Sequence, residues 1–506
     1  MVLTSPLAAQ PFRQPSIRLP APQQRQKAPE FPSTFKWLNN DQPLQIHGNL
    51  KGHVIILDFW TYCCINCMHV LPDLEYLEHK YAGRPVAIIG VHSAKFTTEQ
   101  DPTNIEQAIQ RYRIEHPVIV DEDHAIWNSY GVRAWPSFMV IDSAGRAVGQ
   151  LSGEGKREVL DAVIGQLLEE GRVDGSLAKE AVKFRPTLLE RPLTELAFPG
   201  KVAADPAGKR LVIADSNHDR VIVTDLDGKV LHVIGTGERG FRDGSFTEAQ
   251  FYDPQGIVID GDVLYIADTK NHSLRKIDLA AGTVTTIAGT GKQVYDRTGG
   301  GKGTEQGLSS PWDLALDRER NRLIIAMAGP HQLWDHDLTT GVTKAWVGSG
   351  RETIIDGPAD QACLAQPSGL AIHGEHIYFA DSEVSAVRRA RLSDGRVETL
   401  IGTGLFDFGH RDGDWSGALL QHCLGVAALG DHILVADTYN NALRRIDLKS
   451  RTIETVLGGP KSDVLDEPAG LTVADGKVYI ADTNNHRIVR YDPQTGQTQP
   501  LAIEIK

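Results

Sequence analysis

The sequence predicts a multidomain chain, with an N-terminal α/β domain followed by an all-β six-bladed propeller. Three observations indicate this. Short apolar runs alternate with helical stretches up to about residue 172, a 15-residue pattern recurs beyond residue 200, and the 506 residues include 49 glycines and 26 prolines. Alternating strands and helices are typical of a sheet covered by helices, whereas repeated antiparallel strands need many turns. A chain of this length also exceeds what one compact core usually serves.

The α/β domain is expected over residues 31–172. We expect its strands at residues 54–59, 86–93, 116–121 and 137–142, and its helices at residues 66–81, 104–114 and 157–171. Residues 1–30 are rich in proline and glutamine without any periodicity, so we expect them to be disordered. Residues 173–195 contain prolines and no clear period, which predicts a linker.

The propeller is expected over residues 196–506, where one pattern recurs. Its copies read VIADSNHDRVIVTDL (212–226), YIADTKNHSLRKIDL (265–279), YFADSEVSAVRRARL (378–392), LVADTYNNALRRIDL (434–448) and YIADTNNHRIVRYDP (479–493), with a weaker copy, IIAMAGPHQLWDHDL, at 324–338. Equivalent positions lie 45 to 59 residues apart, which leaves room for four strands in each unit. Four antiparallel strands repeated six times predict six blades around a channel.

The polar residues of the repeat are expected to serve the fold. The repeated aspartates are Asp215, Asp268, Asp381, Asp437 and Asp482, with Met327 at this position in the weaker copy; the repeated arginines are Arg275, Arg388, Arg444 and Arg487. Asp and Asn-His in a tight turn bind backbone groups or adopt a left-handed conformation. Each arginine is expected to meet an acidic neighbour. Longer loops between blades begin at residues 243, 356 and 412, and such loops commonly carry a binding surface.

Composition and charge narrow the function classes. The net charge is −13 at pH 7 and the pI is about 5.8, which opposes binding to nucleic acid or anionic lipid. No apolar run is long enough to span a bilayer, and the N-terminus lacks the pattern of a secretory leader. We therefore expect a soluble cytoplasmic protein with no nucleic-acid partner, no membrane partner and no cofactor.

Three of the five cysteines lie together in the stretch DFWTYCCINC (58–67). In a reducing compartment, clustered cysteines are more often catalytic or metal-binding than structural. Cys64 is expected where a strand ends and a helix begins, and the free amides of a helix N-terminus favour a thiolate. We predict that Cys64 is a nucleophile and that Cys67 closes a disulfide with it. Cys363 and Cys423 are expected to be buried apolar residues.

The segment DFWTYCCINCMHVLP (58–72) resembles the active-site segment of thioredoxins. The resemblance places Asp58 as the buried acid near the second cysteine. AWPSFMVID (134–142) is similar to the second thioredoxin signature, which implies a cis Trp135-Pro136 bond and a preceding backbone that pairs with an extended protein substrate. The whole chain, with its A-D-T-x-N-H repeats, resembles NHL repeat-containing proteins that carry a thioredoxin-like domain.

Two other interpretations of the cysteine cluster stay open. Cys63, Cys64, Cys67 and His69 could bind a metal, although their spacing does not match separated zinc-ligand pairs. The cysteines could also be buried filler in an idle thioredoxin fold. Cys63 replaces the usual tryptophan, and Ile65-Asn66 replaces Gly-Pro, so the sequence does not set the direction of electron flow. A regular bond between Cys63 and Cys64 would be strained.

The sequence thus leads to a thiol–disulfide oxidoreductase as the first hypothesis. In this hypothesis Cys64 and Cys67 are catalytic, Asp58 assists proton transfer, Cys63 and the Trp135-Pro136 loop support the site, and the propeller holds a protein substrate or redox partner. The second hypothesis is a non-catalytic interaction scaffold. The third is a propeller that binds RNA or an axial metal, which the acidic excess of the repeat region disfavours for RNA.

Overall fold

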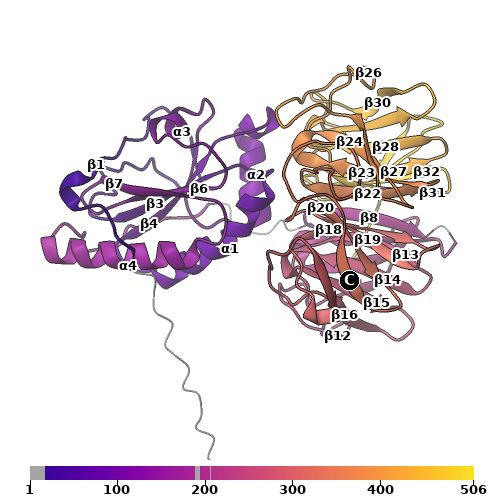
Figure 1. Cartoon of the computed structure of the whole chain (residues 1–506), viewed down its shortest axis with the longest axis horizontal. Coiled ribbons are helices and arrows are strands. Elements are labelled where there is room, and N and C mark those ends of the chain that lie inside the picture. Colours follow the sequence, from indigo (N-terminus) through magenta and orange to yellow (C-terminus); the bar gives the residue numbers. More distant parts are fainter. Residues whose placement is uncertain (1–16, 188–193, 206, 506) are drawn as a thin grey trace, which may run out of the picture. The chain divides into compact units, whose positions relative to one another are not determined.

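The structure is a computed structural model that describes residues 17–187, 194–205 and 207–505 (Figure 1). The chain divides into two compact units, Met1–Glu190 and Arg191–Lys506. The first unit is a thioredoxin-like α/β domain and the second is a six-bladed β-propeller, so the predicted fold class is confirmed. Among the described residues, no helix has the length and apolar character needed to cross a bilayer.

The first unit contains a seven-stranded sheet with the strand order β1-β7-β6-β3-β4-β5-β2. Strands β3, β4 and β5 are parallel, and the others pair antiparallel. The strands are β1 (Gln26–Lys27), β2 (Trp37–Leu38), β3 (Val54–Trp60), β4 (Val86–His92), β5 (Val118–Val120), β6 (Ser137–Ile141) and β7 (Arg146–Ser152). The helices are α1 (Ile65–Lys80), α2 (Pro102–Tyr112), α3 (Ala125–Ser129) and α4 (Arg157–Asp174), with short 3₁₀ turns η1 (Pro22–Gln24) and η2 (Thr98–Gln100).

Strand β3 lies at the centre of this sheet and is buried along its whole length. Its side chains alternate between the two faces, as those of any strand do. Val54 and Ile56 pack with α1 and α4 on one face, whereas Leu57 and Phe59 pack with α3 and the N-terminal segment on the other. Asp58 has the same parity as Ile56, so its carboxyl points to the face that α1 covers.

Two expectations about the domain boundaries are wrong for the residues that the structure describes. Residues 17–30 are not a disordered tether, because β1 pairs with β7 and Arg25 is buried against Asp142 and Glu170 at 3.1 and 2.9 Å. Residues 175–187 are not a free linker either, because Val182 donates its backbone N–H to His53 at 2.8 Å. Long-range ion pairs and hydrogen bonds order both segments, and composition does not reveal such contacts. Val173 and Asp174, the first two residues of the predicted linker, end α4. Residues 1–16 and 188–193 of these two predicted segments lie outside the described residues.

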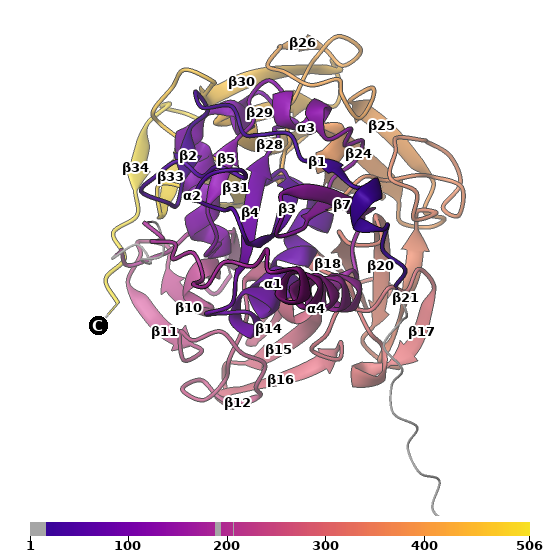
Figure 2. The ribbon, with the colours of Figure 1, turned by 90° about the vertical axis from the view of Figure 1, so that its left-hand side faces the viewer.

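The second unit consists of six antiparallel sheets around a common axis, the blades of the propeller (Figure 2). The first blade contains β8 (Lys201–Asp205), β9 (Arg210–Asp215), β10 (Arg220–Asp225) and β11 (Val230–Ile234). The second contains β13 (Pro254–Asp260), β14 (Val263–Asp268), β15 (Ser273–Asp278) and β16 (Thr283–Ala288). The third contains β18 (Pro311–Asp317), β19 (Arg322–Met327), β20 (Gln332–Asp337) and β21 (Val342–Val347). The fourth blade contains β22 (Pro367–His373), β23 (His376–Asp381), β24 (Ala386–Arg391) and β25 (Val397–Ile401). The fifth contains β27 (Gly425–Leu429), β28 (His432–Asp437), β29 (Ala442–Asp447) and β30 (Thr452–Gly458). The sixth contains β31 (Pro468–Ala474), β32 (Lys477–Asp482), β33 (Arg487–Tyr491) and β34 (Thr498–Pro500). Three blades gain a short fifth strand at one edge from the loop before them: β12 (Gly244–Ser245), β17 (Gly299–Lys302) and β26 (Gly413–Asp414).

The repeated aspartate and arginine form a buried ion pair within the blade. Arg444 Nη1 lies 2.5 Å from Asp437, and its Nη2 lies 2.6 Å from Asp412, the first residue of a long loop between blades. The corresponding sets are Asp268, Arg275 and Asp243, and Asp381, Arg388 and Asp356. The predicted acidic neighbour is therefore confirmed for these arginines. The loop aspartates have a structural role, because each one ties the start of its loop to the blade.

The polar turn of each repeat joins neighbouring blades. The residue that ends this turn has a positive φ in every blade, as predicted, and its side chain accepts a hydrogen bond from a backbone N–H of the next blade. These residues are Asp219, His272, His331, Ser385, Asn441 and His486. The repeated histidines therefore serve blade contacts.

The ring closes by the same contacts and without exchange of a strand between the first and last blades. His486 of the last blade accepts a hydrogen bond from Phe198 N at 3.1 Å, and Thr483 Oγ1 donates to Pro199 O at 2.9 Å. Ser216, Thr269, Ser382 and Thr438 make the equivalent hydroxyl contact in other blades. The hydroxyl after each repeated aspartate therefore explains the A-D-[ST] pattern.

Replacing Arg444 with methionine should destabilise the propeller. The change leaves Asp437 buried without its cation, which costs about 3–5 kcal/mol. The double variant Arg444→Met/Asp437→Leu should lose less stability than the sum of the losses of the two single variants, because neither charge is then left buried without its partner. Calorimetric unfolding of the full chain measures both effects.

The matched control is Arg445→Met, one residue further along β29. Arg445 pairs with Glu454 on the exposed side of the blade, so its loss should cost less than about 1 kcal/mol. Equal losses for Arg444→Met and Arg445→Met would contradict the structural role of the buried pair.

Candidate active site

The CCINC stretch lies at the turn between β3 and α1. Cys64 is the N-cap of α1, and its carbonyl oxygen accepts hydrogen bonds from Cys67 N at 3.0 Å and Met68 N at 3.1 Å. Cys64 is half-buried, whereas Cys67, in the first turn of the helix, is buried. All five cysteines are free thiols in this structure. The structure therefore places the two residues where the sequence predicts them, Cys64 at the start of the helix and Cys67 in its first turn.

A buried glutamate fixes the turn that carries the cysteines. Glu99 Oε1 accepts the backbone N–H of Cys63 at 2.8 Å, while its Oε2 accepts those of Lys95 and Phe96 at 3.0 and 2.9 Å. Tyr112 adds a hydrogen bond from its hydroxyl to the Tyr62 carbonyl at 3.0 Å. The sequence analysis missed Glu99, because nothing local distinguishes one glutamate in the polar stretch before α2.

The two redox candidates differ in electrostatic environment. Burial raises the pKa of the Cys67 thiol well above that of an ordinary cysteine, and a hydrogen bond with Cys64 and the charge of Asp58 raise it further. Cys67 is therefore held as a neutral thiol at pH 7. A group that removes its proton is needed before Cys67 can act as a nucleophile.

Asp58 is the candidate for the group that removes the proton of Cys67. It is fully buried, and neither carboxylate oxygen has a hydrogen-bond partner among the described residues. Burial raises the pKa of Asp58 to about 7, while the charge of His116 lowers it and the charge of Glu78 raises it. A carboxyl that titrates near neutral pH can take up and release a proton under physiological conditions.

The second predicted signature forms the start of β6. The Trp135-Pro136 bond is cis, as the resemblance implied, and the Pro136 carbonyl accepts the N–H of Gly153 at 2.9 Å. The Trp135 ring lies 4.6 Å from the Trp127 ring and packs against the core on the face opposite Asp58. Trp135 therefore serves mainly to anchor this loop.

Two residues of the alternative metal set, His69 and Cys63, contact other side chains of the first unit. His69 Nδ1 lies 2.8 Å from Glu154 Oε2, and Cys63 Sγ lies 3.9 Å from Thr61 Oγ1. Among the described residues, the groups close enough to share an ion do not combine Cys64, Cys67 and His69. The geometry therefore supports a thiol pair at this turn more than a four-ligand metal site.

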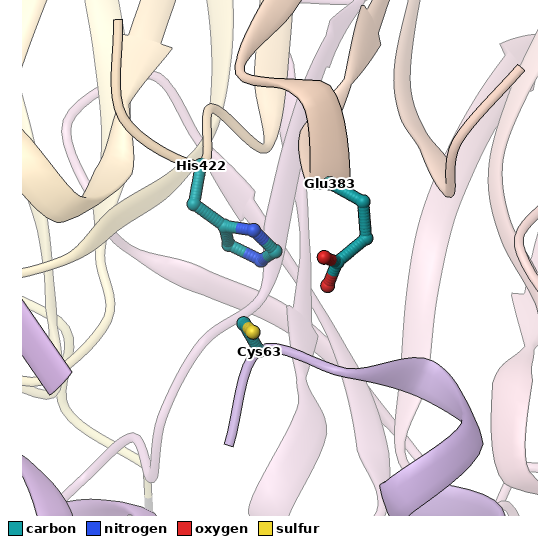
Figure 3. A group of neighbouring side chains, drawn as sticks. All are labelled: Cys63, Glu383 and His422. Carbon is teal, nitrogen blue, oxygen red and sulfur yellow. The ribbon is translucent and has the colours of Figure 1, made fainter. Parts of the chain in front are cut away.

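The propeller carries a separate pair of titratable side chains in its fourth and fifth blades (Figure 3). Glu383 lies in the turn η6 (Ser382–Val384), and His422 precedes β27; a carboxylate oxygen and a ring nitrogen lie within 4.8 Å of each other. The His422 ring stacks on Tyr439 with 4.5 Å between centroids. Cys363 and Cys423 are buried, as predicted. The divergent fourth blade thus differs from the others in the chemistry of its turn.

The comparisons with known proteins agree with this architecture. A family model described as Thioredoxin-like matches residues 52–147, and the NHL repeat model matches residues 251–277 and 465–491. NHL repeat-containing protein 2 of Gallus gallus is 40% identical over 94% of this chain and 71% of its own length. The chain belongs to the NHL repeat-containing protein 2 family. Protein SUPPRESSOR OF QUENCHING 1, chloroplastic, of Arabidopsis thaliana is 42% identical over 94% of this chain.

The chain matches 48% of the Arabidopsis protein, so it spans about half of that relative's length. The thioredoxin-like domain has its own relatives. Thiol-disulfide oxidoreductase YkuV of Bacillus subtilis is 24% identical over 29% of this chain and 97% of its own length. The first domain thus has a relative of about its own length.

Replacing Asp58 with asparagine should stabilise the first unit at neutral pH. The folded carboxyl holds its proton up to about pH 7, whereas in the unfolded chain it titrates near its ordinary value of 3.8. The free energy of unfolding of the wild type therefore falls as pH rises from about 4 to 7, and Asp58 causes no further fall above pH 7. The variant lacks this loss, so its advantage should grow over that window to at most about 4 kcal/mol.

Urea unfolding of the full chain, followed by the helical circular dichroism signal, measures this difference, because all described α-helices belong to the first unit. Asp121→Asn is the matched control. Asp121 accepts hydrogen bonds from Ile126 N and Trp127 N at 2.9 Å and from Ser93 Oγ at 3.0 Å, so its variant should lose stability at pH 7. A pH-independent difference for Asp58→Asn would contradict the raised pKa.

Proposed function

We propose that the chain is a thiol–disulfide oxidoreductase in which Cys64 is the attacking residue, Cys67 the resolving residue and Asp58 the proton acceptor. The observation that carries this proposal is the arrangement of the two thiols. Cys64 is half-buried at the start of α1, and Cys67 is buried and hydrogen-bonded to Cys64. Thiol–disulfide exchange needs one accessible thiolate and a second thiol in reach.

The reduction of a disulfide in a protein substrate proceeds in two steps. The Cys64 thiolate attacks one substrate sulfur, the substrate S–S bond breaks, and the substrate leaves one thiolate while a mixed disulfide forms. Cys67 then gives its proton to Asp58 and attacks Cys64 Sγ, which releases the second substrate thiolate. The substrate gains two electrons, the Cys64–Cys67 pair loses two, and a dithiol reductant restores the pair.

The rest of the chain would select the substrate. The backbone before Pro136 is the proposed place where an extended substrate segment pairs, and Cys63 and Glu99 hold the turn that presents Cys64. The propeller would bind a protein partner, since its fold supports protein interaction and its repeated polar residues are used in blade contacts. We propose no cofactor, because the electrons come from the cysteines themselves.

Cys64→Ser should abolish dithiol-dependent reduction of a protein disulfide such as insulin, because the attacking sulfur is lost. Cys67→Ser should retain the first step and accumulate a mixed disulfide with the substrate, since no thiol resolves it. Turnover assays and mass spectrometry of trapped adducts measure the two effects. Cys363→Ala is the control: it removes a buried propeller thiol and should leave turnover within about twofold.

The scaffold interpretation gives the opposite result. If wild type and Cys64→Ser reduce insulin at the same rate, and no Cys67→Ser adduct forms, the thioredoxin-like domain has no redox activity of this kind. A protein partner retained by Cys64→Ser/Cys67→Ser but lost on deletion of the propeller would then assign the chain a binding role alone.

A further inference from the structure

We propose that His116, positioned by Glu78, relays protons between the sealed Asp58 carboxyl and solvent during resolution by Cys67. This inference rests on the proposed function and adds two residues to it. Both lie outside the cysteine turn: His116 precedes β5, and Glu78 lies near the end of α1, three turns beyond Cys67.

The first argument is that Asp58 has no direct route to water. Its exposed fraction is 0%, and no described group donates a hydrogen bond to either oxygen. A buried carboxyl that accepts a proton from Cys67 must pass that proton on before the next turnover. The route needs a neighbouring group that can both take and release a proton.

The second argument is the space beside Asp58 on the adjacent strand. Asp58 and Gly90 are opposite each other in the parallel β3–β4 pair, so a side chain at residue 90 would share the face of Asp58. A Cβ built on Gly90 would lie 3.2 Å from His116 Nε2 and 2.9 Å from Trp60 Nε1. Glycine therefore leaves this space to the imidazole of His116, which enters from the segment before β5.

The third argument is the orientation of His116. Its Nδ1 lies 2.8 Å from Glu78 Oε1, an arrangement in which Nδ1–H donates to the carboxylate. Its Nε2 has no hydrogen-bond partner among the described residues and lies in the space beside Gly90. The Glu78 contact thus fixes the ring so that the other nitrogen is available on the Asp58 side.

The outer end of this chain of groups reaches the surface. A pocket of about 240 Å³ opens there and is lined by Glu78, His116, Glu115, Arg84 and Tyr81 together with apolar residues of α1, β4 and the segment 181–186. The Glu78 side chain keeps 17% of its surface exposed. Protons can therefore be exchanged with water at Glu78, while Asp58 stays sealed at the inner end.

The charges around Asp58 oppose each other. Asp58 faces Cys67 and Glu78 from α1 and His116 from the segment before β5, and the charge of His116 lowers the pKa of Asp58 whereas the charge of Glu78 raises it. Burial lowers the pKa of His116, but the charge and hydrogen bond of Glu78 and the charges of Asp58 and Glu115 outweigh it and raise the pKa above its usual value. Loss of His116 should therefore make Asp58 a weaker acid.

The proton transfer balances at each atom. The Cys67 S–H bond breaks as an O–H bond forms on Asp58. That O–H bond then breaks as the neutral form of His116, with its proton on Nδ1, gains a proton on Nε2, and the resulting cation releases its Nδ1 proton to the Glu78 carboxylate, which returns it to water. The ring regains the Nδ1–H form by proton exchange with water in the pocket that His116 lines. No electrons move in these steps, so the redox balance stays with the two cysteines.

The test separates the two thiol steps with a nitrobenzoate disulfide as probe. Attack by Cys64 releases one coloured thiolate, and resolution by Cys67 releases the second. His116→Gln should leave the first release unchanged, slow the second about tenfold at pH 7, and move its pH midpoint upward by about one unit. Glu78→Gln should also slow the second release, and by less, because it removes the group that takes the Nδ1 proton of His116.

His53→Gln is the matched control, because His53 is a buried histidine of the same domain that bonds Leu50 O and Val182 N and has no contact with Asp58. It should leave both releases unchanged. Nitrogen-15 NMR of the His116 ring gives a second readout, in which Glu78→Gln should lower the pKa of His116 even if His116→Gln fails to fold, because the charge and hydrogen bond of Glu78 raise that pKa.

A second release in His116→Gln with wild-type rate and midpoint would overturn the relay, as would a His116 titration that Glu78→Gln does not lower. The proposed function fails differently: the wild type would then release no second thiolate at all. A wild type that releases both thiolates, with Asp58→Asn impaired and His116→Gln normal, would retain the oxidoreductase and remove only His116 and Glu78 from it.

Discussion

The thioredoxin-like domain depends on keeping one carboxyl group buried without a partner in the middle of its sheet. Burying Asp58 costs stability at neutral pH, since its charged form loses the hydration it would have in water. The same burial raises the pKa to about 7, where the carboxyl can accept a proton from a thiol. Structure around it follows from this constraint: α1 covers the carboxyl, Gly90 leaves room beside it, and His116 brings a compensating charge.

The propeller treats its buried carboxylates in the opposite way. Asp437 accepts hydrogen bonds from Gln421 N and from the Asn440 side chain, both at 2.8 Å, and also pairs with Arg444. A carboxylate with all its oxygens engaged holds neighbouring segments in register, because removing any partner leaves a buried charge. Asp268 and Asp381 pair with Arg275 and Arg388 in the same way, whereas Met327 replaces the aspartate in the third blade. The fold explains these repeated residues, so in the proposed function partner selection falls to residues that differ between blades.

The sequence predicted the parts of this molecule whose signal is local or periodic. The strand, the cysteines and the helix start lie within ten residues, and the blade motif recurs six times, so both the thiol pair and the propeller could be inferred. Glu99, His116 and Glu78 could not, because Glu99 bonds a residue 36 positions away and His116 bonds one 38 positions away. For the same reason Arg25, in a segment of disordered composition, gave no sign of its pair with Asp142, 117 residues on.

In the proposed mechanism, burial also fixes the order in which Cys64 and Cys67 act. Cys64 stands half-buried at the free amides of α1, where a substrate sulfur can reach it and where negative charge is favoured. Only 1% of the Cys67 surface is exposed, so the sulfur that Cys67 can reach is that of Cys64. Because its pKa is raised, it is held as a protonated thiol. In the proposed mechanism Asp58 takes this proton, and an accessible first thiol with a sealed second thiol allows release of the substrate only after the mixed disulfide has formed.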